Sequence, residues 1–223
     1  MRIAALLFAA LTLAAPAAAA PTAVMLGDVR IGLDTPPGFS DTRFTGSPRL
    51  SELAESLTSA SNRILIFALT DADLRAFMTG ERPELRRYLL AATPRRLERE
   101  HVTPALFTRF VEDATREHGS APPPDTDLRV YLDSKPREAP TLLAELRRTP
   151  ELVSVLQGAR VQGESSFWGE KPRYLISTTT LLLLRGKALG LSVYSNFDGP
   201  ADLEWIRYAT ERWLEELQRL NAR

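Results

Sequence analysis

The sequence contains no cysteine and only two histidines, His101 and His118. Without cysteine the chain has no disulfide bond, no thiol nucleophile and no lipid-modified cysteine of the kind that anchors bacterial lipoproteins. The histidines lack the close spacing of metal ligands, and no obvious third ligand accompanies them. The G-x-S-x-G motif, which carries the nucleophilic serine of many hydrolases, is also absent. The sequence therefore gives no indication of a serine hydrolase of that kind. We therefore predict neither a metal site nor a cofactor.

The chain also lacks an excess of charge of either sign, since 28 lysines and arginines are balanced by 28 aspartates and glutamates. A near-neutral balance argues against binding to nucleic acid or to an anionic membrane surface. Lys135, Lys171 and Lys187 are the only lysines, so nearly all basic side chains are arginine. Abundant arginine and alanine are typical of a GC-rich bacterial gene.

Residues 1–20 have the pattern of a secretory signal peptide. Arg2 provides a positive start, Ile3–Leu13 an apolar stretch of suitable length, and Ala14–Ala20 a run of small residues. We expect cleavage at the end of this run, which leaves residues 21–223 as one globular domain. In a bacterium the mature protein would lie in the periplasm or be secreted into the medium.

The clearest secondary-structure pattern in the remaining chain is that of a β-hairpin. Tyr174–Leu184 is rich in threonine and leucine and predicts a strand. Arg185–Lys187 predicts the turn, with its charges facing water and its glycine free to adopt a positive φ. The returning strand ends at Phe197 and alternates apolar with polar residues. The first strand is too short to cross a bilayer, because Arg173 and Arg185 bracket it.

A helix follows the hairpin. Pro200–Leu220 has the periodicity of an amphipathic helix, with Asp198 as its expected N-cap. We expect this helix to lie across the hairpin and to bury Trp213. Its stripe recurs at spacings of three and four: Leu203, Ile206, Thr210, Trp213, Leu217 and Leu220.

Shorter patterns predict the remaining elements, of which the strand Ile64–Leu69 is the most apolar. Leu152–Val161 fits a strand or a helix, and its valines favour the strand. Together the elements predict a single-domain α+β fold, an α/β/α sandwich with a mostly antiparallel sheet. The other predicted strands are Val29–Leu33, Arg86–Thr93 and an edge strand Leu128–Leu132, and the other predicted helices are Ser47–Asn62, Asp71–Met78, Thr103–Gly119 and Pro140–Arg148.

This layout resembles the PsbP-like and DcrB-like domains. The matching features are an opening strand closed by Pro36–Phe39, a helix after it, the apolar strand Ile64–Leu69 and the terminal hairpin with its helix. They cover most of the mature chain, whereas Ala121–Gly163 has no clear counterpart. The resemblance implies a compact α/β/α sandwich in an exported or lumenal accessory protein without catalytic activity. The resemblance assigns no functional residue to this chain.

Asp71 and Asp73 are the best-defined candidates for catalytic residues. They follow the strand Ile64–Leu69 in a D-x-D arrangement that resembles the first motif of haloacid-dehalogenase-type phosphatases. Paired carboxylates of this kind hold Mg²⁺ or supply a nucleophile and an acid. Leu74 departs from the family pattern, and no later acidic metal motif follows. The alternative, which we prefer, is a helix start in which Thr70 and Asp73 form a capping box.

The candidates for binding are a group of arginines and one aromatic loop. Arg95, Arg96 and Arg99 concentrate positive charge that would bind an acidic partner or a phosphate, unless they are solvated surface charges. Trp168 lies with Phe167 in a polar loop before the hairpin. An exposed aromatic side chain there would mark a binding loop, and a buried one would belong to the core.

Two functions remain open on this basis. The first is an exported accessory or interaction protein without catalysis, whose partner is another envelope protein or a small apolar ligand held between the helix Pro200–Leu220 and the sheet. The second is a small metal-dependent hydrolase that uses Asp71 and Asp73. Carboxylates that converge on a concave site would favour the hydrolase.

Overall fold

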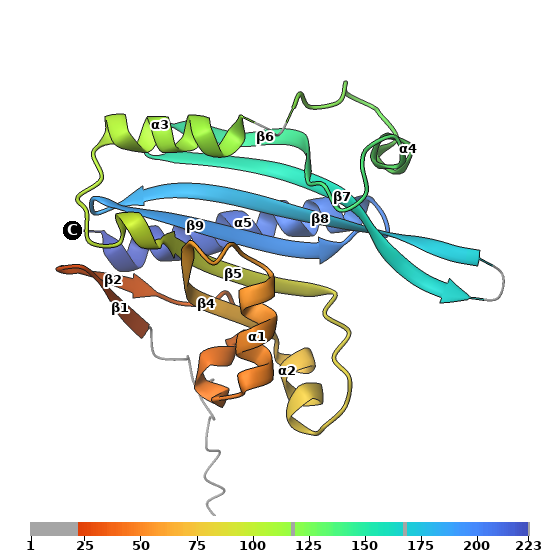
Figure 1. Cartoon of the computed structure of the whole chain (residues 1–223), viewed down its shortest axis with the longest axis horizontal. Helices are drawn as coiled ribbons and strands as arrows, with labels where there is room; N and C mark the ends of the chain where they lie inside the picture. Colours follow the sequence, from red (N-terminus) through yellow and green to blue (C-terminus); the bar gives the residue numbers. More distant parts are fainter. Residues whose placement is uncertain (1–21, 117–118, 167–168, 223) are drawn as a thin grey trace, which may run out of the picture.

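Strands and helices alternate irregularly along the chain, and helices lie on both sides of a large central sheet (Figure 1). The structure is a computed structural model that describes residues 22–116, 119–166 and 169–222, with the backbone alone for 163–166 and 169–171. The strands are β1 (Thr22–Leu26), β2 (Val29–Leu33), β3 (Phe39–Asp41), β4 (Asn62–Thr70), β5 (Arg87–Pro94), β6 (Thr141–Thr149), β7 (Leu152–Ser166), β8 (Gly169–Leu184) and β9 (Lys187–Asn196). The helices are α1 (Pro48–Ser56), α2 (Asp71–Met78), α3 (Pro104–Thr115), α4 (Leu128–Asp133) and α5 (Pro200–Asn221), with short 3₁₀ turns η1 (Thr42–Thr45) and η2 (Arg95–Leu97).

The central sheet has seven strands in the order β3-β4-β5-β9-β8-β7-β6, and every neighbouring pair is antiparallel. β1 and β2 form a separate antiparallel hairpin. Helix α5 covers one face of the central sheet, whereas α1, α2 and α3 cover parts of the other. Along β7, Leu152 and Leu156 therefore face α5, while Val153 and Val155 face α3. The predicted α+β sandwich is confirmed, and Leu152–Val161 is strand.

Helix α5 carries the buried stripe that the sequence predicts. Trp213 is 1% exposed, and its indole Nε1 donates to the carbonyl oxygen that follows β2 at 2.8 Å. The Thr210 hydroxyl is 2.5 Å from that of Thr178 on β8, so this polar pair is satisfied inside the core. Asn221 bonds the Gly32 backbone on β2 in both directions, at 2.9 and 2.8 Å. The helix therefore joins the small sheet to the large one. No helix in the described ranges is both long and apolar enough to cross a bilayer.

The start of α5 differs from the prediction, because Gly199 and not Asp198 is its N-cap. Asp202 accepts hydrogen bonds from the backbone N–H groups of Asp198 at 2.9 Å and of Gly199 at 3.2 Å. Partial burial alone would raise the pKa of Asp202, but these bonds and one from Arg87 outweigh it and lower the pKa. The Asp198 carboxylate instead pairs with Arg86.

Two segments adopt a conformation other than the predicted one. Leu128–Asp133 is the helix α4 and not an edge strand, because the Asp127 carboxylate accepts hydrogen bonds from the first N–H groups of the helix at 2.9 and 3.2 Å. Thr141–Thr149 is strand β6 and not a helix, although its leucine, glutamate and arginine residues favour a helix. Pairing with β7 along the whole segment, with two register shifts, overrides this local preference.

Replacing Trp213 with alanine should lower the free energy of unfolding by about 3–5 kcal/mol, the cost of removing a large aromatic side chain from a core. Trp205 is the matched control, because it lies on the same helix but is only partly buried. Its replacement with alanine should cost less. Urea unfolding measures both changes, and a loss below about 1 kcal/mol for Trp213→Ala would contradict the buried stripe.

Candidate functional site

Asp71 and Asp73 lie at the N-terminus of α2, directly after β4. Asp73 is 8% exposed. Its carboxylate accepts hydrogen bonds from the Thr70 hydroxyl at 2.9 Å and from the N–H groups of Glu84 and Leu85 at 2.8 and 3.3 Å. The Thr70 hydroxyl in turn accepts from the Asp73 N–H at 3.1 Å. The predicted helix start is confirmed, and Asp73 also ties the loop before β5 to α2.

Asp71 is exposed and accepts a hydrogen bond from the Ser40 hydroxyl at 2.7 Å. Neither Asp71 nor Asp73 lines the two cavities described below. Across the described ranges, no three side chains of aspartate, glutamate or histidine are grouped so that they could hold a metal ion. The surroundings of the D-x-D pair are therefore those of a helix start.

The arginine candidates for binding lie on the surface. Arg95, Arg96 and Arg99 are exposed just beyond β5, and Arg95 Nε donates to a backbone carbonyl oxygen before β4 at 3.2 Å. None of the three lines the cavities described below. Trp168 lies outside the described residues.

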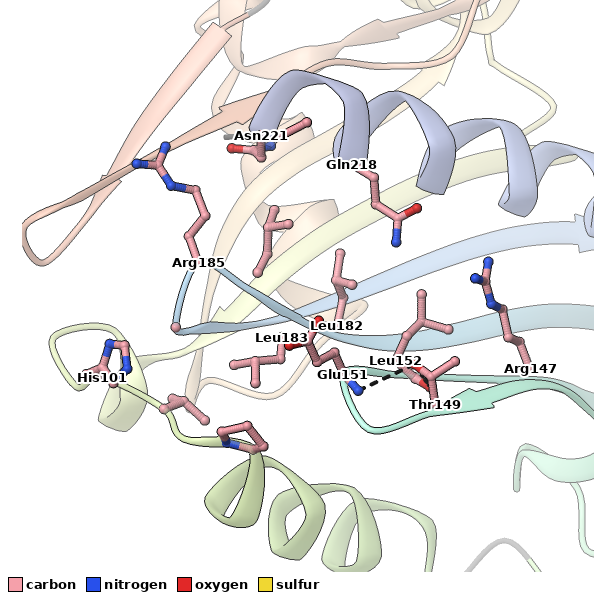
Figure 2. A pocket seen from close by; sticks show the side chains of 15 residues that line it. His101, Arg147, Thr149, Glu151, Leu152, Leu182, Leu183, Arg185, Gln218 and Asn221 are labelled. Carbon is pink, nitrogen blue, oxygen red and sulfur yellow. Dashed lines mark hydrogen bonds between the residues drawn. The ribbon is translucent and has the colours of Figure 1, made fainter.

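The larger cavity, which we call the sheet-end pocket, lies where the β8–β9 turn, the β6–β7 turn, the loop before α3 and the end of α5 meet (Figure 2). Its volume is about 630 Å³. Figure 2 shows Arg185 and Arg147 on opposite sides of the pocket, with leucine side chains between them. The lining includes Arg147, Arg185, His101, Leu152, Leu182 and Leu183.

Gly186 allows the loop before α3 to pack directly on the β8–β9 turn. Its φ of 74° is in the left-handed region, and a Cβ at this position would lie 2.5 Å from two atoms of the His101 ring. The Val102 N–H donates to the Gly186 carbonyl oxygen at 2.8 Å. The glycine therefore suits the left-handed backbone of the turn, and a Cβ in its place would force the exposed His101 ring to move.

Lys187 is buried, contrary to the prediction that the charges of the turn face water. It is 1% exposed. Its Nζ donates to the carbonyl oxygens of Glu98 and Glu100 at 3.2 and 2.8 Å and lies 3.9 Å from the Asp28 carboxylate. These acceptors replace water, which is why an ammonium group can lie this deep. Lys187 thereby holds the loop that carries His101 against the β8–β9 turn.

The sheet-end pocket has a cationic rim over an apolar floor. Arg185 Nη1 donates to a backbone carbonyl oxygen of β2 at 3.0 Å, and Arg147 is exposed on the other side. Glu151 is the acidic residue of the lining. The end of α5 adds limited negative potential, because the carbonyl oxygens of Leu217 and Arg219 are already hydrogen-bonded. The pocket therefore suits an anionic group at each end and an apolar group between them.

The sequence alone did not indicate that the residues lining this pocket lie close together. Arg147 falls in a segment predicted as a helix, and Arg185 was predicted as a solvated charge of a turn. They approach each other only through the pairing of β6, β7 and β8. The space between α5 and the sheet, where the sequence suggested a ligand, is filled by Trp213 and Leu217, and the pocket lies beyond it at the end of the helix.

Comparison with known proteins gives no family for this chain: no family model matches it, and no curated protein matches it significantly. Among solved structures, the Ran-binding protein Mog1p of Saccharomyces cerevisiae is similar with a TM-score of 0.39 and 13% identity, over 90% of this chain and 93% of that chain. A point mutant of the protein Mog1 is similar with the same TM-score and identity, over 90% of this chain and 94% of that chain. At this level the similarity carries no inference about function.

The two aspartates should differ in their effect on stability. Asp73→Asn should lower the free energy of unfolding by about 1–2 kcal/mol, because it weakens the cap and the tie to the next loop. Asp71→Asn, the matched control two residues earlier on the exposed side, should cost less than about 0.5 kcal/mol. Urea unfolding compares them, and equal losses would contradict the structural role of Asp73.

Gly186→Ala should destabilise the protein more than Gly46→Ala. Both glycines have a positive φ, at 74° and 63°, but a Cβ at Gly46 has nothing within 4 Å whereas one at Gly186 meets His101. The strain of the left-handed conformation, about 1 kcal/mol, should be common to both. Thermal unfolding should show a further loss of about 0.5–1 kcal/mol for Gly186→Ala, because the exposed His101 ring must leave its place on the turn. Equal losses would mean that His101 does not pack on the turn.

Proposed function

We propose that the chain is an exported accessory protein that binds an acidic segment of another envelope protein in the sheet-end pocket, without catalysing a reaction. The observation that carries the proposal is the placement of Arg147 and Arg185 on opposite sides of an apolar floor (Figure 2). Guanidinium groups pair with carboxylates in a bidentate geometry. The arrangement therefore favours a peptide that has an acid at each end.

Export rests on the pattern of residues 1–20, which predicts the periplasm or the medium. The balance of charges favours a protein partner over nucleic acid. The resemblance of the layout to PsbP-like and DcrB-like accessory domains supports the same role.

The floor of the pocket defines the middle of the peptide. Leu152, Leu182 and Leu183 line the floor but are only 2%, 2% and 7% exposed. A leucine side chain placed on them would be partly covered and would contribute less than the roughly 1.5–3 kcal/mol of full burial. Each exposed ion pair adds about 0.2–1 kcal/mol, so the apolar contact and the arginines share the affinity and the arginines supply the selectivity. Glu151 lines the pocket and would repel an acid placed at the centre of the peptide. The preferred sequence is therefore two apolar residues between two acids.

The capped peptide Glu-Leu-Leu-Glu tests this proposal on protein recovered from the periplasm, whose mass should first show that residues 1–20 have been removed. Calorimetric titration should give a dissociation constant of about 0.1 mM at low salt. Raising the salt to about 0.3 M should weaken binding about threefold or more. The capped peptide Gln-Leu-Leu-Gln keeps the shape without the charges and is the matched control.

Arg147→Gln should weaken binding of the acidic peptide about two- to fivefold, because one carboxylate loses an exposed ion pair. Arg207→Gln changes an exposed arginine of α5 outside the pocket and should leave the affinity unchanged. Equal binding of the two peptides, or no effect of Arg147→Gln, would contradict the proposed site. An intact signal segment in the recovered protein would contradict export.

The alternative function, a metal-dependent hydrolase, would use Asp71 and Asp73. A metal ion at Asp73 would have to displace the hydrogen bonds from Thr70, Glu84 and Leu85. Turnover of a generic phosphatase substrate that disappears when both aspartates are changed to asparagine would favour the hydrolase over the accessory role.

A further inference from the structure

A second cavity, which we call the α3 cavity, lies on the sheet face opposite α5. Its volume is about 500 Å³, and it is bounded by the C-terminal end of α3, the two residues just before β6 and side chains of β7, β8 and β9. It shares no lining residue with the sheet-end pocket. Figure 1 shows α3 lying along the β6–β7 side of the sheet. The cavity is therefore independent of the peptide site proposed above.

Gln157 of β7 lines this cavity and is 4% exposed. Its Oε1 accepts a hydrogen bond from the Thr179 hydroxyl at 2.9 Å, and its Nε2 has no acceptor among the described residues. If the amide is turned over, Nε2 donates one hydrogen to the Thr179 hydroxyl oxygen and the other still has no acceptor. In either orientation, one buried N–H group of Gln157 has no acceptor among the described residues, and leaving such a donor unpaired is costly.

The remaining lining selects an uncharged ligand with an apolar body. Val153, Val155 and Leu181 form apolar walls. Asp113 is the one acidic residue of the lining, and its carboxylate is paired with Arg116 at 2.6 Å outside the cavity. No lysine, arginine or histidine of the described residues lines the cavity itself. An anionic ligand would therefore lose its hydration without finding a cation to pair with in the lining.

Tyr194 gives the cavity a fixed aromatic wall. Its ring stacks on that of Tyr88, with centroids 4.5 Å apart and planes at 15°. Burial raises the pKa of the Tyr194 hydroxyl, against a smaller lowering by Ser192, so the phenol stays neutral at physiological pH. A flat ring of a ligand can pack beside this wall without meeting a charge.

We propose that the α3 cavity binds a small neutral molecule whose carbonyl oxygen accepts a hydrogen bond from Gln157 and whose apolar, ring-containing body packs against Val153, Val155 and Tyr194. Ketones and amides of aromatic compounds have this chemistry. The buried amide provides orientation, and the valine and tyrosine walls provide most of the contact area.

Acetophenone is the probe, and ethylbenzene, which has a similar shape without the carbonyl oxygen, is its matched control. Titration of the isotope-labelled protein, followed by nuclear magnetic resonance, should give a dissociation constant of about 1–10 mM for acetophenone. The side-chain N–H signals of Gln157 should shift in step with binding. Ethylbenzene should bind about tenfold more weakly, because it leaves the amide unpaired.

Gln157→Met should weaken acetophenone binding about tenfold and leave ethylbenzene binding unchanged or stronger. Gln162→Met, at an exposed position of the same strand, is the matched control and should bind as the natural chain does. Ala114→Phe, on the exposed side of α3, should block the cavity without disturbing the core and should abolish binding. Binding that leaves the Gln157 signals unshifted, that persists in Ala114→Phe, or that is absent up to about 20 mM acetophenone would overturn the proposal.

Discussion

The packing of α5 across β8 and β9 is the interaction on which the rest of the structure depends. Trp213 lies at its centre, where it fills the space over the sheet and bonds the connection after β2. Asn221 at the end of the same helix holds Gly32, so the two sheets are joined through one element. Because α5, α4 and β2 together cover this face, the two cavities lie at the end of α5 and on the opposite face under α3.

Buried hydroxyl groups make this packing specific as well as stable. Thr178 is paired with Thr210 across the helix–sheet interface, and Ser154 with Thr180 across β7 and β8 at 2.7 Å. A shift of one residue in either register would separate these pairs and leave polar groups unsatisfied in the core. The register they fix also places Arg185 in the turn beside the β6–β7 edge, where the sheet-end pocket forms.

The sequence correctly predicted those elements in which the local residue pattern favours the same secondary structure as the tertiary packing does. The hairpin, α5 and the start of α2 at Thr70 belong to this group, since periodicity and capping chemistry are local signals. Strand β6 was missed because its residues favour a helix, and only the exposed edge of β7 makes it a strand. Lys187 was missed because nothing in its neighbourhood along the chain shows that two distant carbonyl oxygens will cover its ammonium group. The pocket residues come from separate elements, so neither spacing nor composition could bring them together.

The most direct test of the central claim, that this fold binds a partner at the end of its sheet and uses its aspartates for structure, is to map where an acidic peptide binds. Chemical-shift changes of the isotope-labelled mature protein, recorded during titration with the capped Glu-Leu-Leu-Glu peptide, would locate the site. The account predicts that the largest changes cluster at His101, Arg147 and Arg185. A cluster of changes around Asp71 and Asp73, or changes scattered over the whole surface, would contradict it.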